Sequence, residues 1–499
     1  MFVNKMQDFG FRPFIAPALG VFLSLGGAAA VSHAQTAQLP VNPSPNYSSL
    51  NNPYYGSVTV HPATDGVIKL SLDEAVGRGL ETNLGLMQAE VNERSLRGQV
   101  AEATQNFLPS ITVTGGSGYN EYNLAALGFS SGFLNKIADS GVFPPSQFAG
   151  FSLITKATVT TGQVNYDQTL FSFTYIDGYK AVKAAETAAY FGKMSARGEV
   201  VQQVATAYLA VIAAESDVAN AKALMDEDKV LLDQAHDKHE AGTVANLDEV
   251  RARVQYQQQQ QTVVAYENRR EKAEILLKRE IGMAPGQKIE LVDPNPYNEL
   301  ALRTPEDLKA EAYANRQDYQ NLQAQEREAK MLVGASKAQR LPTITFRGNY
   351  GVTEVAGVGA HGTMLAVGTL KFPIFREASL RGDTDVAKAQ MQGVVQQLED
   401  LRGHIDQQVR SSLLDVEAAQ QLVQVARSNV DLATQALSDE TDRFNAGIDD
   451  TLPLVRAQAT LQSAQSNLVQ SLYQYNLAKL ALARSAGVLE QQYKAYLGR

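Results

Sequence analysis

An internal repeat constrains this chain more than any other feature of its sequence. A leucine-proline step occurs twice, in Phe107-Leu108-Pro109 and in Arg340-Leu341-Pro342, at an offset of 233 residues. The same offset relates 71–74 to 304–307, where a Ser or Thr stands three residues before an acid, as at a capped helix start. The chain is therefore predicted to contain two copies of one structural unit.

The two copies differ by one insertion. Leu170-Phe171 aligns with Ile374-Phe375 at an offset of 204, and Gly242 aligns with Gly447 at 205. Because the offset falls from 233 to 204, the first copy holds 29 additional residues, within the Gly-, Ser- and Phe-rich segment of about 119–155. An insertion that leaves both flanks aligned is most simply a longer surface loop.

Periodicity within each copy changes twice. Apolar residues recur at helical spacing up to the leucine-proline step, alternate through the next segment and return to helical spacing afterwards. Each copy is predicted to contain a helix, a strand, a loop, a strand, a long helix and a shorter helix. The first copy is assigned to 67–290, with strands at about 109–122 and 156–173 and a hairpin tip near 242; the second is assigned to 291–490, with strands at about 342–354 and 362–375, a tip near 447 and a tail at 491–499.

The predicted strands alternate apolar and polar residues. After Pro342, one face carries Ile344, Phe346, Tyr350 and Val352, and the other carries Thr343, Thr345, Arg347 and Asn349. A soluble β-sandwich gives the same alternation, so the pattern of a single strand does not distinguish a soluble sheet from one in a membrane. Four strands are too few to close a barrel, and a sheet edge in lipid leaves backbone groups unsatisfied. Strands pooled from three chains number twelve, within the range of known barrels.

Two segments predict very long helices, 174–241 and 376–446. No proline interrupts either one, and roughly 65 helical residues reach ~100 Å. Apolar residues recur at spacings of three and four, which suits coiled-coil packing, and abundant alanine permits neighbours on both sides. A closed ring of helices is favoured, and a solid coiled-coil stalk is the alternative. Each helix is predicted to end at a glycine, Gly242 or Gly447, before the chain turns back into a shorter helix.

The amino terminus predicts export from the cytoplasm. Residues 15–31 are apolar, follow two basic residues and precede Ser32-His33-Ala34, a small-residue cleavage pattern. We interpret 1–34 as a signal peptide; an uncleaved transmembrane anchor is the alternative. Residues 35–66 are rich in Pro, Asn and Ser and predict an extended, poorly ordered leader.

Composition excludes several classes of protein. The chain has no cysteine, which excludes disulfides, thiolate metal sites and a lipid anchor on cysteine. A net charge of -9 without a basic patch argues against nucleic acid as a partner. No catalytic triad, phosphate-binding loop or zinc motif is found, so no enzyme activity, cofactor or metal is predicted. His236 and His239 have a spacing compatible with a metal, but a solvated helix face explains them more simply.

In combination, these motifs resemble the TolC family of outer-membrane efflux channels, over about residues 67–490. The resemblance rests on both leucine-proline steps, on Lys371-Phe372-Pro373-Ile374-Phe375 before a long helix, and on the glycine reversals at 241–248 and 446–452. It implies an α+β membrane protein: a homotrimer with a twelve-strand β-barrel in outer-membrane lipid and a twelve-helix α-barrel in the periplasm. Such proteins are not enzymes; they dock with a periplasmic adaptor and an inner-membrane pump and export small molecules or proteins.

The resemblance also implies functional residues. Family members narrow the periplasmic entrance with acids six and nine positions after the second-copy glycine, where this chain has Pro453 and Arg456. The first-copy equivalents are Asp248 and Arg251. We therefore expect an entrance gate of different charge, in which a mixed ring of Asp248, Arg251 and Arg456 forms interprotomer ion pairs; simple solvated tip charges are the alternative. Asp449 and Asp450 lie one turn nearer the tip and complete the set of gate candidates.

Two further sets of residues are singled out. The adaptor-docking tips are predicted at the two reversals, with the residues Gly242, Thr243, Val244, Gly447 and Ile448. An aromatic girdle at the periplasmic rim of the barrel is predicted where strands pass into helices, with the residues Phe171, Phe173, Tyr175, Phe372 and Phe375. Burial in an ordinary core is the alternative for these aromatic residues. For the whole protein, the alternative to an efflux conduit is a structural or adhesive stalk with a small membrane anchor.

Overall fold

The computed structural model describes residues 52–498, with gaps within 128–152 and at 244, 294–296, 302, 358, 447, 449 and 450. The described elements all belong to one unit, Ser48–Arg499. The predicted signal peptide, 1–34, lies outside the described residues.

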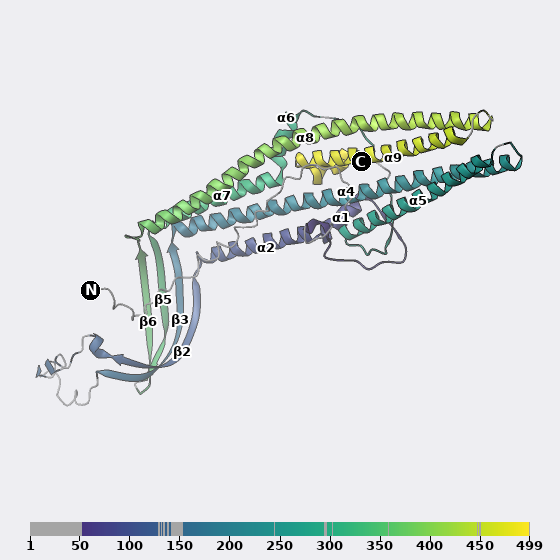
Figure 1. Cartoon of the computed structure of the whole chain (residues 1–499). Helices are drawn as coiled ribbons and strands as arrows, with labels where there is room; N and C mark the ends of the chain where they lie inside the picture. Colours follow the sequence, from purple (N-terminus) through teal and green to yellow (C-terminus); the bar gives the residue numbers. More distant parts are fainter. Residues whose placement is uncertain are drawn as a thin grey trace, which may run out of the picture. The chain divides into compact units, whose positions relative to one another are not determined.

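Each half of the chain contains short helices, then two strands of the main sheet, then a long helical hairpin (Figure 1). The first half consists of η1 (Pro53–Tyr55), β1 (Val67–Leu70), α1 (Leu72–Thr82), α2 (Leu84–Gln105), β2 (Ser110–Asn123), η2 (Leu124–Leu127), β3 (Ile154–Phe171), α4 (Phe173–Glu240) and α5 (Asn246–Glu280). The second half consists of β4 (Lys288–Leu291), α6 (Pro305–Asn315), α7 (Gln317–Ala338), β5 (Thr343–Val355), β6 (Gly359–Lys371), α8 (Glu377–Asn445), α9 (Thr451–Ser485) and α10 (Leu489–Leu497).

The expectation of one helix before each leucine-proline step is wrong, because two helices stand there in each half. Asn83 is extended and its side-chain oxygen accepts from the amide of Gly85 at 2.9 Å, which caps α2 and ends α1. Arg316 is likewise extended between α6 and α7. The predicted caps are confirmed, since Ser71 Oγ accepts from the Glu74 amide and Thr304 Oγ1 from the Asp307 amide, each at 3.2 Å.

The described part of the leader, residues 52–66, begins with the short helix η1 and is held by hydrogen bonds, unlike the predicted, poorly ordered segment. The amide of Val58 donates to the Thr82 carbonyl at 2.8 Å, and the amide of His61 donates to the Gly282 carbonyl at 2.9 Å. Main-chain hydrogen bonds to two helix ends therefore hold this segment, a stabilisation that its composition does not reveal.

Four strands form an antiparallel sheet in the order β2-β3-β5-β6, and β1 pairs in parallel with β4. The predicted second strand of each pair ends earlier than expected, at Phe171 in β3 and at Lys371 in β6. Pro373 has no amide hydrogen to continue the ladder of β6. Phe372 and Phe375 consequently follow the strand instead of lying within it.

The long helices form two hairpins, α4 with α5 and α8 with α9 (Figure 1). Helices α4 and α8 have 68 and 69 residues, or ~100 Å each. Helix α2 packs along α4, and α7 packs against both α4 and α8. In the described part of the chain, no helix has the length and apolar composition needed to cross a membrane.

The main core lies where the short elements meet the middle of the hairpins. Tyr208 of α4 is fully buried, and its hydroxyl oxygen lies within hydrogen-bond distance of the Leu70 carbonyl oxygen, at 3.0 Å, and of Asp293 Oδ2, at 2.7 Å. The amide of Leu72 donates to the same carboxylate oxygen. The predicted tail is largely helix α10, whose Lys494 pairs with Asp73 at 2.6 Å. This ion pair thus connects α10, near the end of the chain, to the start of α1.

Candidate functional site

The register of the four-stranded sheet separates apolar from polar side chains. Val164 of β3 is opposite Val113 of β2 and Tyr350 of β5, and residues directly opposite project from the same face. Exposed apolar residues gather on this face: Ile111, Val113, Val164, Tyr350, Val352 and Met364. The alternation predicted from the sequence is therefore continuous across neighbouring strands.

The other face is predominantly polar. The Asn165 side chain donates to Thr114 Oγ1 at 3.0 Å, and Arg347 Nε donates to Asp167 Oδ1 at 2.7 Å. Leu365 of β6 lies on this face as well, opposite Asn349. Among the described strands, β2 and β6 each have one hydrogen-bonded neighbour, so the sheet has two open edges. The sheet therefore presents an exposed apolar face and two edges whose backbone groups are available to pair with another chain.

At the first hairpin tip, Gly242 adopts the predicted left-handed conformation with φ of +75°. Thr243 Oγ1 donates to the Lys238 carbonyl at 2.8 Å, which closes the end of α4. At the second tip, Ile448 is 68% exposed and its amide donates to the Arg443 carbonyl at 3.0 Å. The tip candidates Val244 and Gly447 lie outside the described residues, as do the gate candidates Asp449 and Asp450.

Two of the predicted gate residues lie together, and they contact the second hairpin. Arg251 Nη1 lies 3.4 Å from Asp248 Oδ1, one turn away on α5. Asp248 also accepts a hydrogen bond at 2.8 Å from Thr451, which is fully buried at the start of α9. Asp248 therefore joins the first turns of α5 and α9, a role that sequence reasoning missed because 203 residues separate the partners.

Arg456 and Pro453 do not join this group. Arg456 is exposed on α9 and, within the described residues, forms no ion pair, while Pro453 is half-buried in the first turn of the same helix. A single protomer thus does not assemble the mixed ring of Asp248, Arg251 and Arg456. The arrangement leaves Arg456 accessible to groups outside this chain.

Apolar side chains join the two hairpins behind the tips. The cluster comprises Leu231, Ala235, Ala252, Phe444 and Leu454. Lys238 of α4 places its ammonium 4.1 Å from the Phe444 ring centroid, and this ammonium donates to the Phe444 carbonyl at 3.3 Å. The tips are therefore fixed to each other within one chain.

His236, one of the two histidines near the first tip, lies beside two carboxyl groups. His236 lies 3.3 Å from buried Glu249 and 3.5 Å from Glu240. Arg253 also binds Glu249, at 2.7 Å. Across the described residues, no group of three or more His, Cys, Asp or Glu side chains has the geometry to hold a metal ion.

The aromatic candidates divide into two groups. The rings of Phe171 and Phe173 meet edge to face at 4.7 Å, at the junction of β3 and α4, and Tyr175 follows two residues after Phe173 in the first turn of α4. Phe372 and Phe375 are exposed beyond β6, and Phe375 is 98% exposed. Exposure of all five side chains argues against the alternative of an ordinary core.

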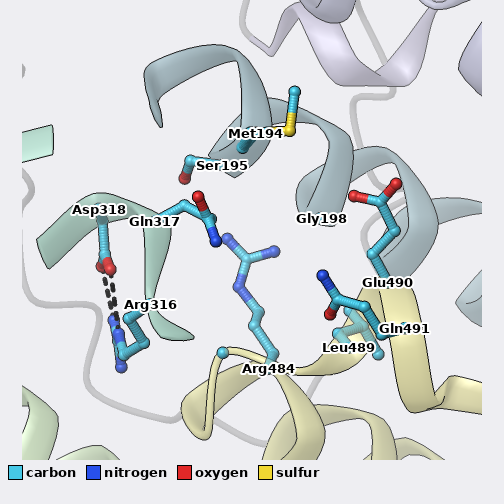
Figure 2. A pocket seen from close by; sticks show the side chains of 11 residues that line it. Met194, Ser195, Gly198, Arg316, Gln317, Asp318, Arg484, Leu489, Glu490 and Gln491 are labelled. Carbon is cyan, nitrogen blue, oxygen red and sulfur yellow. Dashed lines mark hydrogen bonds and ion pairs between the residues drawn. The ribbon is translucent and has the colours of Figure 1, made fainter. Parts of the chain in front are cut away.

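Sequence reasoning also missed a polar pocket where α4, α7, α9 and α10 meet. Figure 2 shows Arg484 reaching into this pocket beside the ion pair of Arg316 with Asp318, which is 2.6 Å long. Burial acts to raise the pKa of Asp318, but the hydrogen bonds and charge of Arg316 outweigh it and lower that pKa. Glu490, which also lines the pocket, pairs with Arg197 of α4 at 2.7 Å. Arg316 and Asp318 are only two residues apart in the chain, whereas Arg197 and Glu490 are 293 residues apart and meet only in the tertiary structure.

Buried carboxyl groups on the first hairpin were missed as well. Asp228 of α4 is 1% exposed, and burial raises its pKa to about 6, although a hydrogen bond from Gln255 opposes the shift. Glu280, at the end of α5, is 2% exposed, and burial raises its pKa to about 8. Burial of these two carboxyl groups could not be predicted, because Asp and Glu in a helix are usually solvent-exposed and nothing in the local sequence distinguishes the buried ones.

Known proteins share this fold. A solved structure of the Campylobacter jejuni CmeC outer membrane channel superimposes with a TM-score of 0.68 at 15% identity, covering 93% of this chain and 98% of that one. Nodulation protein T of Rhizobium leguminosarum bv. trifolii is 22% identical over 326 residues, covering 64% of this chain and 69% of that protein. Outer membrane protein TolC of Escherichia coli (strain K12) is 23% identical over 319 residues, covering 59% of this chain and 62% of that protein.

These likenesses place the fold among outer-membrane channels. The family model "Outer membrane efflux protein" matches residues 76–283 and 308–488, which is more than half of the chain. The chain therefore belongs to the outer membrane efflux protein family. The family resemblance inferred from the leucine-proline steps and the glycine reversals is confirmed, and with it the location in the outer membrane with a helical part in the periplasm.

Proposed function

We propose that three copies of this chain close a twelve-strand barrel in the outer membrane and a twelve-helix barrel in the periplasm. The observation that carries the proposal is the sheet, with four strands, two open edges and one exposed apolar face. Backbone groups at an open edge are costly in lipid, and joining edges between copies satisfies them. Helices α4, α5, α8 and α9 of three copies supply the twelve helices, consistent with two equivalent halves in each chain.

The proposed function is the outer-membrane step of a tripartite efflux system. A periplasmic adaptor docks at the hairpin tips and connects the channel to an inner-membrane pump, and small molecules or proteins leave through the central conduit. Exposed Ile448 and Thr243 at the two tips suit such docking, because the contacts between the hairpins hold them at a defined separation. The aromatic residues at the strand ends suit the periplasmic rim of the barrel.

The assembled state is tested on the purified full-length protein in detergent and in planar bilayers. We expect a trimeric mass by light scattering and discrete conductance steps. A conducting trimer supports the conduit, whereas a monodisperse monomer without conductance contradicts it. The same preparation provides the reference for every channel measurement below.

The entrance gate is proposed to contain Arg251 and Arg456, with Asp248 of a neighbouring copy as a partner of Arg456. Replacing Arg251 and Arg456 by alanine is expected to increase single-channel conductance, because interprotomer ion pairs that narrow the entrance are lost. Arg269→Ala is the matched control, since Arg269 is an exposed arginine of α5 about 27 Å from Arg251 along the helix. Unchanged conductance in the double variant contradicts this gate.

A further inference from the structure

Asp167 and Arg347 form an ion pair on the two central strands of the sheet, close to the end where β2 begins. They are directly opposite each other on the central strands β3 and β5, and Arg347 Nε lies 2.7 Å from Asp167 Oδ1. The side chains retain 48% and 72% exposure, respectively. The pair thus lies at the surface of the polar face, away from both open edges of the sheet.

The polar face carries few other charges. Strand alternation places Lys371 and His361 of β6 on the same face as Arg347. Within the four described strands, Asp167 is the one carboxylate on this face. Neutralising Asp167 therefore leaves Arg347 and Lys371 without a carboxylate on this face of the four described strands.

The pair also borders a hollow in this face. The lining includes Gln105, Ser110, Asp167, Arg347, Leu365 and Val367. A solute that passes along this face therefore meets both charges directly.

We propose that the Asp167–Arg347 pair sets the charge selectivity of the conduit within the barrel, holding its wall near electrical balance so that anionic and cationic solutes both pass. This inference rests on the proposed trimer, in which polar faces enclose the lumen and apolar faces meet lipid. In the trimer, three Asp167–Arg347 pairs lie at the same depth along the barrel axis. Rings of charged side chains are a general means of selecting ions in pores.

The opposite face provides a matched control. Lys156 and Glu121 form a second cross-strand pair, on β3 and β2, at 3.3 Å. Alternation places this pair on the apolar face that carries Ile111 and Val113. The two pairs share strand β3 and cross-strand geometry but project to opposite sides of the sheet.

The experiment measures the ratio of potassium to chloride permeability from reversal potentials across a KCl gradient in planar bilayers. Asp167→Asn is expected to lower this ratio and Arg347→Gln to raise it, each by about twofold or more at low salt, where screening is weak. The double variant is expected to return close to the wild-type ratio. Glu121→Gln and Lys156→Gln are expected to leave the ratio unchanged.

Folding does not confound the result, because an exposed ion pair contributes little to stability, and retention of the trimer is checked for each variant. If the wild-type trimer conducts and both single variants keep its permeability ratio, this inference is overturned while the conduit stands. A shift of equal size in the control variants also overturns it. Absence of conductance in the wild-type protein contradicts the proposed function itself.

Discussion

At the scale of single residues, the main surprise is how many carboxyl groups are withdrawn from water. Glu280 has almost no exposure, and within the described residues its Oε2 has no hydrogen-bond partner. Burial disfavours the charged form, which is why its pKa rises from 4.5 to about 8. At neutral pH the folded protein therefore holds a proton that the unfolded chain releases.

This proton linkage predicts how stability varies with pH. Because the unfolded chain binds fewer protons between pH 4.5 and about 8, Glu280 lowers the free energy of unfolding progressively across that interval. Glu280→Gln removes this effect, so its stabilisation relative to wild type is expected to grow from near zero at pH 4.5 to about 3 kcal/mol at pH 7. Denaturant unfolding followed by circular dichroism at several pH values measures it.

The matched control is Glu271→Gln, at an exposed position of the same helix. This substitution is expected to leave the pH dependence of unfolding as it is in the wild type. A gain for Glu280→Gln that is the same at every pH would show that Glu280 is already ionised in the folded state.

At the scale of elements, the reversal between α4 and α5 depends on one glycine. Gly242 has φ of +75°, a conformation that side chains with a Cβ rarely adopt. A Cβ placed there meets no atom within 4 Å, so the restriction comes from the backbone alone. The tip therefore has room for a side chain at position 242, but the left-handed backbone conformation there favours glycine.

Replacing this glycine by alanine is expected to loosen the tip. Gly242→Ala costs roughly 1–2 kcal/mol locally, because alanine is strained in the left-handed conformation. Hydrogen exchange of the flanking amides, followed by mass spectrometry, is expected to accelerate. Gly198→Ala is the control, since this α4 glycine is helical, has equal space for a Cβ, and is expected to stabilise its helix by about 1 kcal/mol. Equal exchange in both variants would refute the backbone argument.

At the scale of the whole molecule, the two faces of the sheet meet different surroundings in the proposed barrel. Val113 and Thr112 are neighbours on β2 but project to opposite faces, and Val113 is 79% exposed. A single exposed valine is common on protein surfaces, but Val113 belongs to a continuous apolar surface. Lipid is the surrounding that makes this surface favourable.

An arginine at either position tests this environment. Val113→Arg is expected to impair insertion, since a charge on the lipid face of a barrel costs ~2–4 kcal/mol near the midplane. Thr112→Arg, one residue away on the polar face, is expected to insert normally. Heat-modifiable migration of the outer-membrane fraction compares the two variants. Similar insertion of both would contradict the assignment of the faces.

Local patterns were sufficient for much of the fold. The alternation after Pro342 and the spacing along 174–241 and 376–446 predicted strands and long helices, because a strand or helix repeats its burial every two or 3.6 residues. Glycine at 242 likewise predicted a helix end through its own backbone freedom. These features depend on residues close together in the chain, which is why periodicity and residue type alone revealed them.

Tertiary structure decided what depends on distant partners. The break at Arg316 has no side-chain cap, and the Arg316 side chain instead donates to the carbonyl of Ser485, 169 residues away. Asp248 contacts Thr451 and Asp167 contacts Arg347 only because folding brings segments about 200 residues apart into register. The sequence by itself determined the four long strands, the long helices and the family, whereas packing between elements determined which charges are buried, which are paired and which face the proposed conduit.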